Sequence, residues 1–166
     1  MTVGTTLFTA LIEQMTTPET LERIKARSYD KIIVQYGKGA RPAVESFSFD
    51  GLDIEVYDFK PNLTDDMQKA DLIVSHAGAG TIMECLRLRK RTAVVINSIL
   101  MDDHQKELAN AMSRRQHLVK VDSPLDLKES STWDAIESFQ PVPFEGGDHH
   151  FFPRFLDSFL LEPKAE

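Results

Sequence analysis

Two short runs of small and hydroxyl-bearing residues have the clearest chemical potential in this sequence. Gly4-Thr5-Thr6 follows Thr2-Val3, and His76-Ala77-Gly78-Ala79-Gly80-Thr81 follows the apolar pair Ile73-Val74. Small residues let an anion approach backbone N–H groups, and the start of a helix adds positive potential. The threonine hydroxyls in both runs add hydrogen-bond donors. If a helix follows each run, the pattern predicts a site for a phosphate group.

A glycine-rich turn alone does not identify a ligand, because glycine also lets a helix pack closely on a strand. The dinucleotide fingerprint G-x-G-x-x-G would need a third glycine where Met83 stands, and the next strand ends at Asn97 instead of an acid for the ribose. The sequence contains no G-x-x-x-x-G-K-[ST] and no G-x-S-x-G motif. These observations argue against a dinucleotide enzyme, a P-loop nucleotidase and an α/β-hydrolase.

Two further candidates have simpler structural explanations. Asp148-His149-His150 carries metal-ligating side chains, but no second cluster stands at ligand spacing, so we expect a solvated loop and no metal site. Cys85 lies in a predicted helix beside apolar residues, where a cysteine is typically a small core residue. As the single cysteine of the chain, it excludes an internal disulfide and suits a reducing compartment.

The strands expected to position these turns are short and rich in β-branched residues. Runs at 31–36, 71–75 and 92–96 each contain an unbroken apolar stretch, which indicates burial on both faces, as in a parallel sheet. Further strands are expected at Thr2-Val3, at 118–121 and, with period-two alternation, at 52–57.

Helical patterns lie between the strands. Apolar residues from Leu7 to Met15 recur at helical spacing, and Thr17-Pro18-Glu19 and Thr64-Asp65-Asp66 have the composition of capped helix starts. Further helices are expected at 81–88 and 103–115. The alternation of strands and helices predicts an α/β fold with a Rossmann-like, doubly wound and mostly parallel sheet.

The chain divides into three predicted parts. Residues 1–121 form the Rossmann-like domain, and residues 122–148 are a loose connection with a short helix near 133–139. Residues 149–166 place Phe151, Phe155 and Phe159 at helical spacing, which predicts an amphipathic helix. That helix is expected to pack on the domain, on a partner protein or on both.

The composition restricts the class of protein further. The chain has 166 residues, of which 26 are acidic and 19 are basic, giving a net charge of −7. An acidic balance argues against nonspecific nucleic-acid binding. No apolar run approaches the roughly 20 residues of a membrane span, and Glu13 interrupts the first apolar segment, which argues against a signal peptide. We expect a cytoplasmic protein without an anchor of its own.

Residues 71–109 resemble the nucleotide-sugar-binding segment of GT-B glycosyltransferases. In that superfamily a strand ends in His or Arg followed by x-Gly, a Glu stands eight positions after the His, and an Asp/Gln pair follows the next strand. This sequence has these residues in the same order: His76, Gly78, Glu84, Asp103 and Gln105. The resemblance implies that the chain is the C-terminal, donor-binding half of a GT-B enzyme.

Three separated motifs make the resemblance more specific. V-G-T-T-x-F, D-L-I-V-S-H-A-G-A-G-T and M-D-D-H-Q-x-E-L-A stand in order within residues 2–121. Together they are similar to the small cytosolic subunit of the eukaryotic UDP-N-acetylglucosamine transferase, of glycosyltransferase family 28 type. The resemblance implies transfer of GlcNAc from UDP-GlcNAc to GlcNAc-diphospho-dolichol in a β1,4 bond. It also implies a membrane-anchored acceptor subunit that recruits this chain to the cytosolic face of the endoplasmic reticulum.

The resemblance implies a role for each matched residue. Glu84 accepts hydrogen bonds from the ribose, His76 and the amides of Gly78, Ala79, Gly80 and Thr81 hold the diphosphate, and Gly4, Thr5 and Thr6 lie near it. Asp103 and Gln105 reach the sugar, although His104 stands between them and leaves open which of the three points inward. No general base is assigned to this chain, because it is expected in the partner subunit, and no metal or cofactor is implied.

Three alternatives remain open at this point. Glu84 has an alternative as a helix acid paired with Arg87 or Arg89. The whole chain could instead be a non-catalytic nucleotide-binding α/β regulatory module. A further alternative is that it is a complete small transferase. Dependence on a partner distinguishes these last two from the glycosyltransferase subunit.

Overall fold

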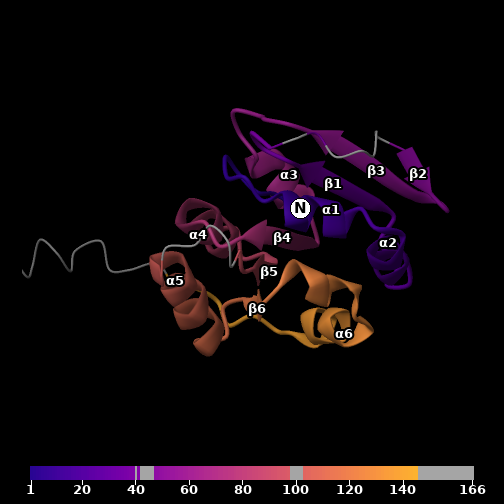
Figure 1. Ribbon diagram of the computed structural model, residues 1–166. Helices are drawn as coiled ribbons and strands as arrows, with labels where there is room; N and C mark the ends of the chain where they lie inside the picture. The colour runs from indigo at the N-terminus through magenta and orange to yellow at the C-terminus, as the bar shows by residue number, and fades with distance from the viewer. Residues whose placement is uncertain (40, 42–46, 98–102, 146–166) are drawn as a thin grey trace, which may run out of the picture.

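The computed structural model describes residues 1–39, 41, 47–97 and 103–145, and for residues 47 and 103–105 it describes the backbone alone (Figure 1). The predicted helix at 149–166 and the cluster Asp148-His149-His150 lie outside the described residues. No helix in the described ranges is long and apolar enough to cross a membrane.

The sheet is built from two three-stranded parts that the N-terminus joins. Thr2 forms parallel bridges to Gln35 on one side and to Ser75 on the other. All strand pairs are parallel except β2 with β3, so the predicted, mostly parallel sheet is confirmed. The order is β2-β3-β1 and β4-β5-β6. The strands are β1 (Lys31–Gln35), β2 (Phe47–Phe49), β3 (Leu52–Tyr57), β4 (Leu72–His76), β5 (Arg91–Val95) and β6 (Val119–Val121).

Helices cover both faces of the sheet, as Figure 1 shows for α4 and α5 on one side of β5 and β6 and α6 on the other. Because successive side chains of a strand point to opposite faces, Ala93 and Val95 enter one core while Val94 and Ile96 enter the other. The helices are α1 (Thr9–Met15), α2 (Pro18–Lys25), α3 (Thr64–Lys69), α4 (Ala79–Arg87), α5 (Asp103–Arg114), the 3₁₀ helix η1 (Pro124–Lys128) and α6 (Ser130–Ser138).

The helix starts confirm one predicted cap and correct another. Thr17 is the N-cap of α2, where its hydroxyl accepts from Thr20 N–H at 3.3 Å and Pro18 occupies the first helical position. Thr64 is not a cap, because α3 has Leu63 at its N-cap position and Thr64 already lies inside the helix. The polar residues around 64 fit a helix start whether residue 63 or residue 64 is the N-cap, so the sequence alone misplaced the boundary by one residue.

Two other features differ from the sequence-based expectation. Leu7 was expected on the buried stripe, but α1 begins at Thr9 and Leu7 is 54% exposed. Leu7 lies before the helix, directly after a turn in which Thr6 N–H donates to Val3 O, so the helical spacing does not apply to it. Strand β2 was not predicted, because three residues are too few to show a period.

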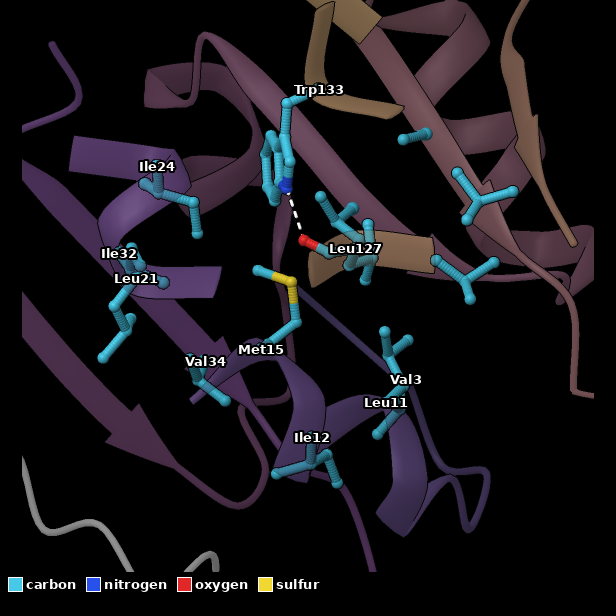
Figure 2. Packing of buried hydrophobic residues seen from close by; sticks show 14 of the residues in the cluster. Val3, Leu11, Ile12, Met15, Leu21, Ile24, Ile32, Val34, Leu127 and Trp133 are labelled. Carbon is cyan, nitrogen blue, oxygen red and sulfur yellow. Dashed lines mark hydrogen bonds between the residues drawn. The ribbon is translucent and has the colours of Figure 1, made fainter. Parts of the chain in front are cut away.

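The larger core lies between the sheet and α1, α2, η1 and α6 (Figure 2). Trp133 of α6 is its largest fully buried side chain, and the indole Nε1–H donates to Leu127 O at 2.6 Å. Glu137 ties α6 to the sheet, because it accepts from Tyr29 at 2.7 Å and from Arg91 at 2.8 Å. The segment after residue 122 thus contains the predicted short helix and also fills the core. The division at 121 and 148 stays a prediction.

Candidate functional site

The two glycine-containing turns of the sequence meet at the carboxyl ends of adjacent strands. Thr2 N–H donates to Val74 O at 2.9 Å and His76 N–H donates to Thr2 O at 3.3 Å, so the strand before Gly4 lies directly beside β4. In parallel α/β sheets this edge is where ligands bind. The structure therefore brings Gly4 next to His76 and to Thr81 at the start of α4, with Thr5 and Thr6 following in the same turn.

The Gly4 turn is held by side chains beneath it. Gly4 has φ +58, a left-handed conformation that favours glycine. Its N–H donates to Gln35 Oε1 at 3.0 Å and to Thr2 Oγ1 at 3.1 Å, so it points into the protein. The Gly4 amide is therefore used inside the protein and does not face the surface of the turn. Thr5 is exposed at the tip of the turn.

His76 lies between the two turns. Its side chain is 6% exposed, and a Cβ at Gly4 would come within 3.2 Å of ring Cε1. A Cβ at Gly78 would come within 2.2 Å of ring Nε2, which is closer than real Cβ contacts, so any larger residue at 78 would have to displace the ring. The imidazole is therefore packed between two glycines that leave room for it.

The environment of the His76 ring is unusual for a core residue. Burial lowers the pKa of His76 below its ordinary value, so the ring is neutral at neutral pH. Within the described part of the chain, the buried Nδ1 has no hydrogen bond of ordinary geometry, although a contact with the Thr2 backbone acts to raise the pKa of the ring. The ring is therefore a buried polar group whose hydrogen bonding the described protein atoms satisfy only in part.

The first turn of α4 presents backbone donors beside this ring. Gly78 is the N-cap of α4 and no side chain caps the helix, so the first N–H groups, at Ala79, Gly80 and Thr81, lack partners within the helix. Ala79 and Gly80 are exposed, and Thr81 Oγ1 lies 3.8 Å from a Cβ placed on Gly4. This helix start fits an anion placed between it and the Gly4 turn.

Glu84 lies one further turn along α4. Its Oε1 accepts a hydrogen bond from Thr64 Oγ1 at 2.7 Å. Arg87 and Arg89 are exposed, and no ion pair joins either of them to Glu84 in the described residues. The alternative in which Glu84 pairs with these arginines is therefore not what the structure contains.

A hollow of about 220 Å³ connects Glu84 with the Gly4 turn. Its far wall is the segment 59–63 between β3 and α3, which sequence reasoning did not select. In this segment Phe59 is 58% exposed, and Lys60 pairs with Asp66 at 2.8 Å and lies 4.0 Å from the centre of the Tyr57 ring. A signal was present in the sequence, because the segment follows a strand at the ligand-binding edge. The hollow is lined by Gly4, Thr5, Gln35, Phe59, Lys60, Pro61, Asn62, Leu63 and Glu84.

The remaining predicted residues are placed only in part. Asp103 and Gln105 lie in the first turn of α5, but their side chains are outside what the structure describes. In the described ranges no group of three or more His, Cys, Asp or Glu residues is arranged to hold a metal ion.

The fold and the site together define a class of protein. A mostly parallel α/β sheet, with an uncapped helix start, a buried imidazole and a carboxylate one turn further along at the carboxyl ends of its strands, is a Rossmann-like domain. Residues 1–138 match the model of the glycosyltransferase family 28 C-terminal domain. The chain belongs to this family, and the matched region ends where α6 ends.

Curated relatives agree with this family. The chain is 43% identical over 118 residues to the UDP-N-acetylglucosamine transferase subunit ALG13 of Homo sapiens. The aligned region covers 71% of this chain and 10% of the human protein. It is 37% identical over 119 residues to the ALG13 subunit of Yarrowia lipolytica. This aligned region covers 71% of this chain and 61% of that protein. The chain thus spans less than two thirds of either relative.

Solved structures support the fold. The NMR solution structure of ALG13 aligns with a TM-score of 0.65 at 21% identity and covers 93% of this chain and 92% of that one. The crystal structure of Acinetobacter baumannii MurG aligns with a TM-score of 0.59 at 21% identity, over 86% of this chain and 46% of that one. The predicted fold class, one half of a GT-B enzyme, is therefore confirmed.

Proposed function

We propose that this chain binds the nucleotide-sugar donor of a two-subunit glycosyltransferase, and that the donor is UDP-GlcNAc. The observation that carries the proposal is the convergence of the Gly4 turn, His76, the start of α4 and Glu84 on one edge of the sheet. The curated relatives are named as UDP-N-acetylglucosamine transferase subunits, which supports the choice of donor. The proposed acceptor is GlcNAc-diphospho-dolichol.

Each part of the site has a role in this proposal. The first N–H groups of α4 bind the diphosphate, and the neutral His76 ring adds a hydrogen bond without adding charge. The Glu84 carboxylate accepts from the ribose hydroxyls, since a carboxylate has four lone-pair positions and no proton to donate. Asp103 and Gln105 remain candidates for contacts to the sugar.

The proposed reaction is an inverting transfer. The 4-hydroxyl of the acceptor attacks C1 of GlcNAc on the face opposite the diphosphate, the bond between C1 and the diphosphate oxygen breaks, and a β1,4 bond forms. The leaving diphosphate gains negative charge, which the start of α4 stabilises more strongly than it stabilises the bound donor. The hydroxyl proton passes to a general base, which we place in the acceptor subunit.

We further propose that the acceptor subunit is membrane-anchored and recruits this chain to the cytosolic face of the endoplasmic reticulum. The word subunit in the names of the relatives supports dependence on a second polypeptide. A GT-B active site lies between two halves, and the family matched here is a C-terminal domain. We therefore expect little or no transfer by the chain alone.

An NMR titration of the chain with UDP-GlcNAc, UDP-glucose and GDP-mannose tests the donor assignment. UDP-GlcNAc is expected to shift the amides of Thr5, His76, Gly80 and Glu84 selectively. No response to any of the three nucleotide sugars, alone or with candidate acceptor subunit present, would contradict donor binding and leave only the fold.

Transfer assays with a co-expressed acceptor subunit separate the enzyme from the alternative, a non-catalytic nucleotide-binding module. The proposal predicts transfer only when both chains are present and a large loss with Glu84→Ala. A partner-independent response to nucleotides without any transfer would favour the regulatory module, and full transfer by Glu84→Ala would remove Glu84 from the site.

A further inference from the structure

Thr64 and Glu84 are joined by a hydrogen bond that crosses two helices. Thr64 is the first residue of α3, and Glu84 lies in the second turn of α4, 20 residues later. The hydroxyl oxygen of Thr64 lies 2.7 Å from Oε1 of the carboxylate, and both side chains are half-buried. Because a carboxylate at neutral pH only accepts, the hydroxyl must be the donor.

The local structure of α3 leaves the Thr64 hydroxyl available for this bond. A threonine at a helix start ordinarily turns its oxygen toward the backbone N–H groups of its own first turn. Here Leu63 is the N-cap, and the Thr64 N–H itself donates to Asn62 Oδ1 at 2.8 Å. The hydroxyl therefore points across to α4, and α3 is held at a fixed distance from the carboxylate.

The hydrogen bond has a consequence for ligand binding. Glutamate has three rotatable side-chain bonds, and a half-buried one that must accept from a ligand loses that freedom when it binds. The bond from Thr64 restrains the carboxylate beforehand, on the wall of the hollow that begins at the Gly4 turn. It also satisfies one lone pair of Oε1 and leaves the other positions for two donors.

We propose that Thr64 is a positioning residue of the donor site, which holds Glu84 ready to accept from both hydroxyls of a vicinal diol such as that of a ribose. The inference rests on the proposed function, in which Glu84 binds the nucleoside. Thr64 itself does not touch the ligand, and it acts through the orientation of the carboxylate.

A double-mutant cycle with UDP as the probe tests this proposal. Thr64→Val keeps the branched shape and removes the donor, and Thr64→Ser keeps the donor. We expect Thr64→Val to weaken UDP binding to the full chain, measured by isothermal titration calorimetry, by up to roughly tenfold, the scale of the side-chain freedom that an unrestrained Glu84 would lose on binding. Thr64→Ser is expected to stay close to the wild type. In a Glu84→Ala background, Thr64→Val is expected to change nothing further.

Each outcome of the cycle has a distinct meaning. A Thr64→Val effect that is equally large in the Glu84→Ala background overturns the proposal, because Thr64 would then act without Glu84. Wild-type affinity in Thr64→Val, together with a loss in Glu84→Ala, overturns the role of Thr64 alone. Wild-type affinity in Glu84→Ala overturns the proposed donor site and this inference with it. Thermal unfolding of all variants identifies any loss that comes from misfolding.

Discussion

The side-chain amide of Gln35 holds both backbone polar groups of Gly4. Its Nε2 donates to Gly4 O at 2.8 Å, and its Oε1 accepts from Gly4 N–H at 3.0 Å. The same Nε2 donates to Asp58 O at 2.8 Å, in the segment that leads into the far wall of the hollow. Gln35 is 2% exposed, so one buried amide connects the Gly4 turn with the loop after β3.

Replacing Gln35 with methionine is expected to destabilise the protein and to impair the site. The side chain keeps its length but loses its hydrogen bonds to Gly4 and Asp58, so that Gly4 N–H keeps only Thr2 Oγ1 and Asp58 O keeps only Gly37 N–H among the partners described. We expect a loss of about 2–4 kcal/mol in unfolding free energy, measured by urea denaturation.

Gln14→Met provides the matched control for that variant. Gln14 is also buried and donates to Thr20 Oγ1 at 2.9 Å, but it lies in α1, away from the hollow. Both variants are expected to lose stability, whereas UDP affinity under conditions where both are folded should fall for Gln35→Met alone. Equal UDP affinity of the two variants would contradict the role of Gln35 in shaping the site.

Gly78 and Gly80 are predicted to respond in opposite ways to alanine. A Cβ at Gly78 would lie 2.2 Å from His76 Nε2, whereas a Cβ at Gly80 meets nothing within 4 Å. Gly78→Ala is therefore expected to displace the ring and cost about 1–3 kcal/mol. Gly80→Ala lies inside α4 and should stabilise the protein by about 0.5–1 kcal/mol. Thermal unfolding of both variants checks this, and a stabilised Gly78→Ala would show that the ring is not confined.

The sequence predicted that the two glycine-containing turns stand at the carboxyl ends of parallel strands. The turn at Gly4 and the turn at His76 each follow a strand of β-branched residues, and the carboxyl ends of parallel strands meet at one edge. The resemblance to GT-B enzymes supplied Glu84 and its spacing from His76. For Asp103 the role in the site stays a prediction.

Other parts depend on contacts that the sequence does not encode locally. Gln35 at the end of a strand reads as a surface residue, and its buried role appears only when the Gly4 turn lies above it. Thr64 is a residue type that commonly caps the start of a helix, and only the position of α4 shows that its hydroxyl reaches Glu84. Trp133 lies in a polar segment, so the folding of α6 into the core was not apparent either.

For a chain that begins at Met1, we expect the free energy of unfolding to depend on pH through the amino group of this residue. Burial lowers the pKa of this group from 8.0 to about 6. Between these values the unfolded chain binds more protons than the folded chain, so stability rises with pH from about 6 to 8. We expect a gain of about 2–3 kcal/mol across that window, measured by urea denaturation of protein whose intact Met1 is verified by mass spectrometry.

N-terminal acetylation isolates this effect. The acetylated chain carries no titrating amino group, so its stability is expected to be flat between pH 7 and 8. His76 contributes in the same direction, because burial lowers its pKa too, but its contribution is complete once the pH exceeds its ordinary value of 6.5. A rise above pH 7 that persists after acetylation would contradict the assignment to Met1.

The sheet has space for a longer strand in front of Met1. The Met1 nitrogen donates to Ile33 O at 2.6 Å and Met1 O accepts from Gln35 N–H at 3.0 Å, so the ladder with β1 is regular up to the first residue. A cavity of about 460 Å³, lined by Met1, Ile32 and Leu72 among others, lies beside this residue. The edges of β1 and β4 that bracket the cavity can pair with further extended residues.

An engineered Val-Ile extension before Met1 is therefore expected to stabilise the protein more than a Gly-Gly extension of the same length. Both extensions remove the charged amino group from the interior, but only Val and Ile bury apolar side chains in the cavity and favour an extended backbone. We expect a difference of about 1–3 kcal/mol in unfolding free energy at pH 7. Equal stability of the two extended chains would mean that the added residues do not enter the sheet, because strand pairing inside the cavity would bury their side chains.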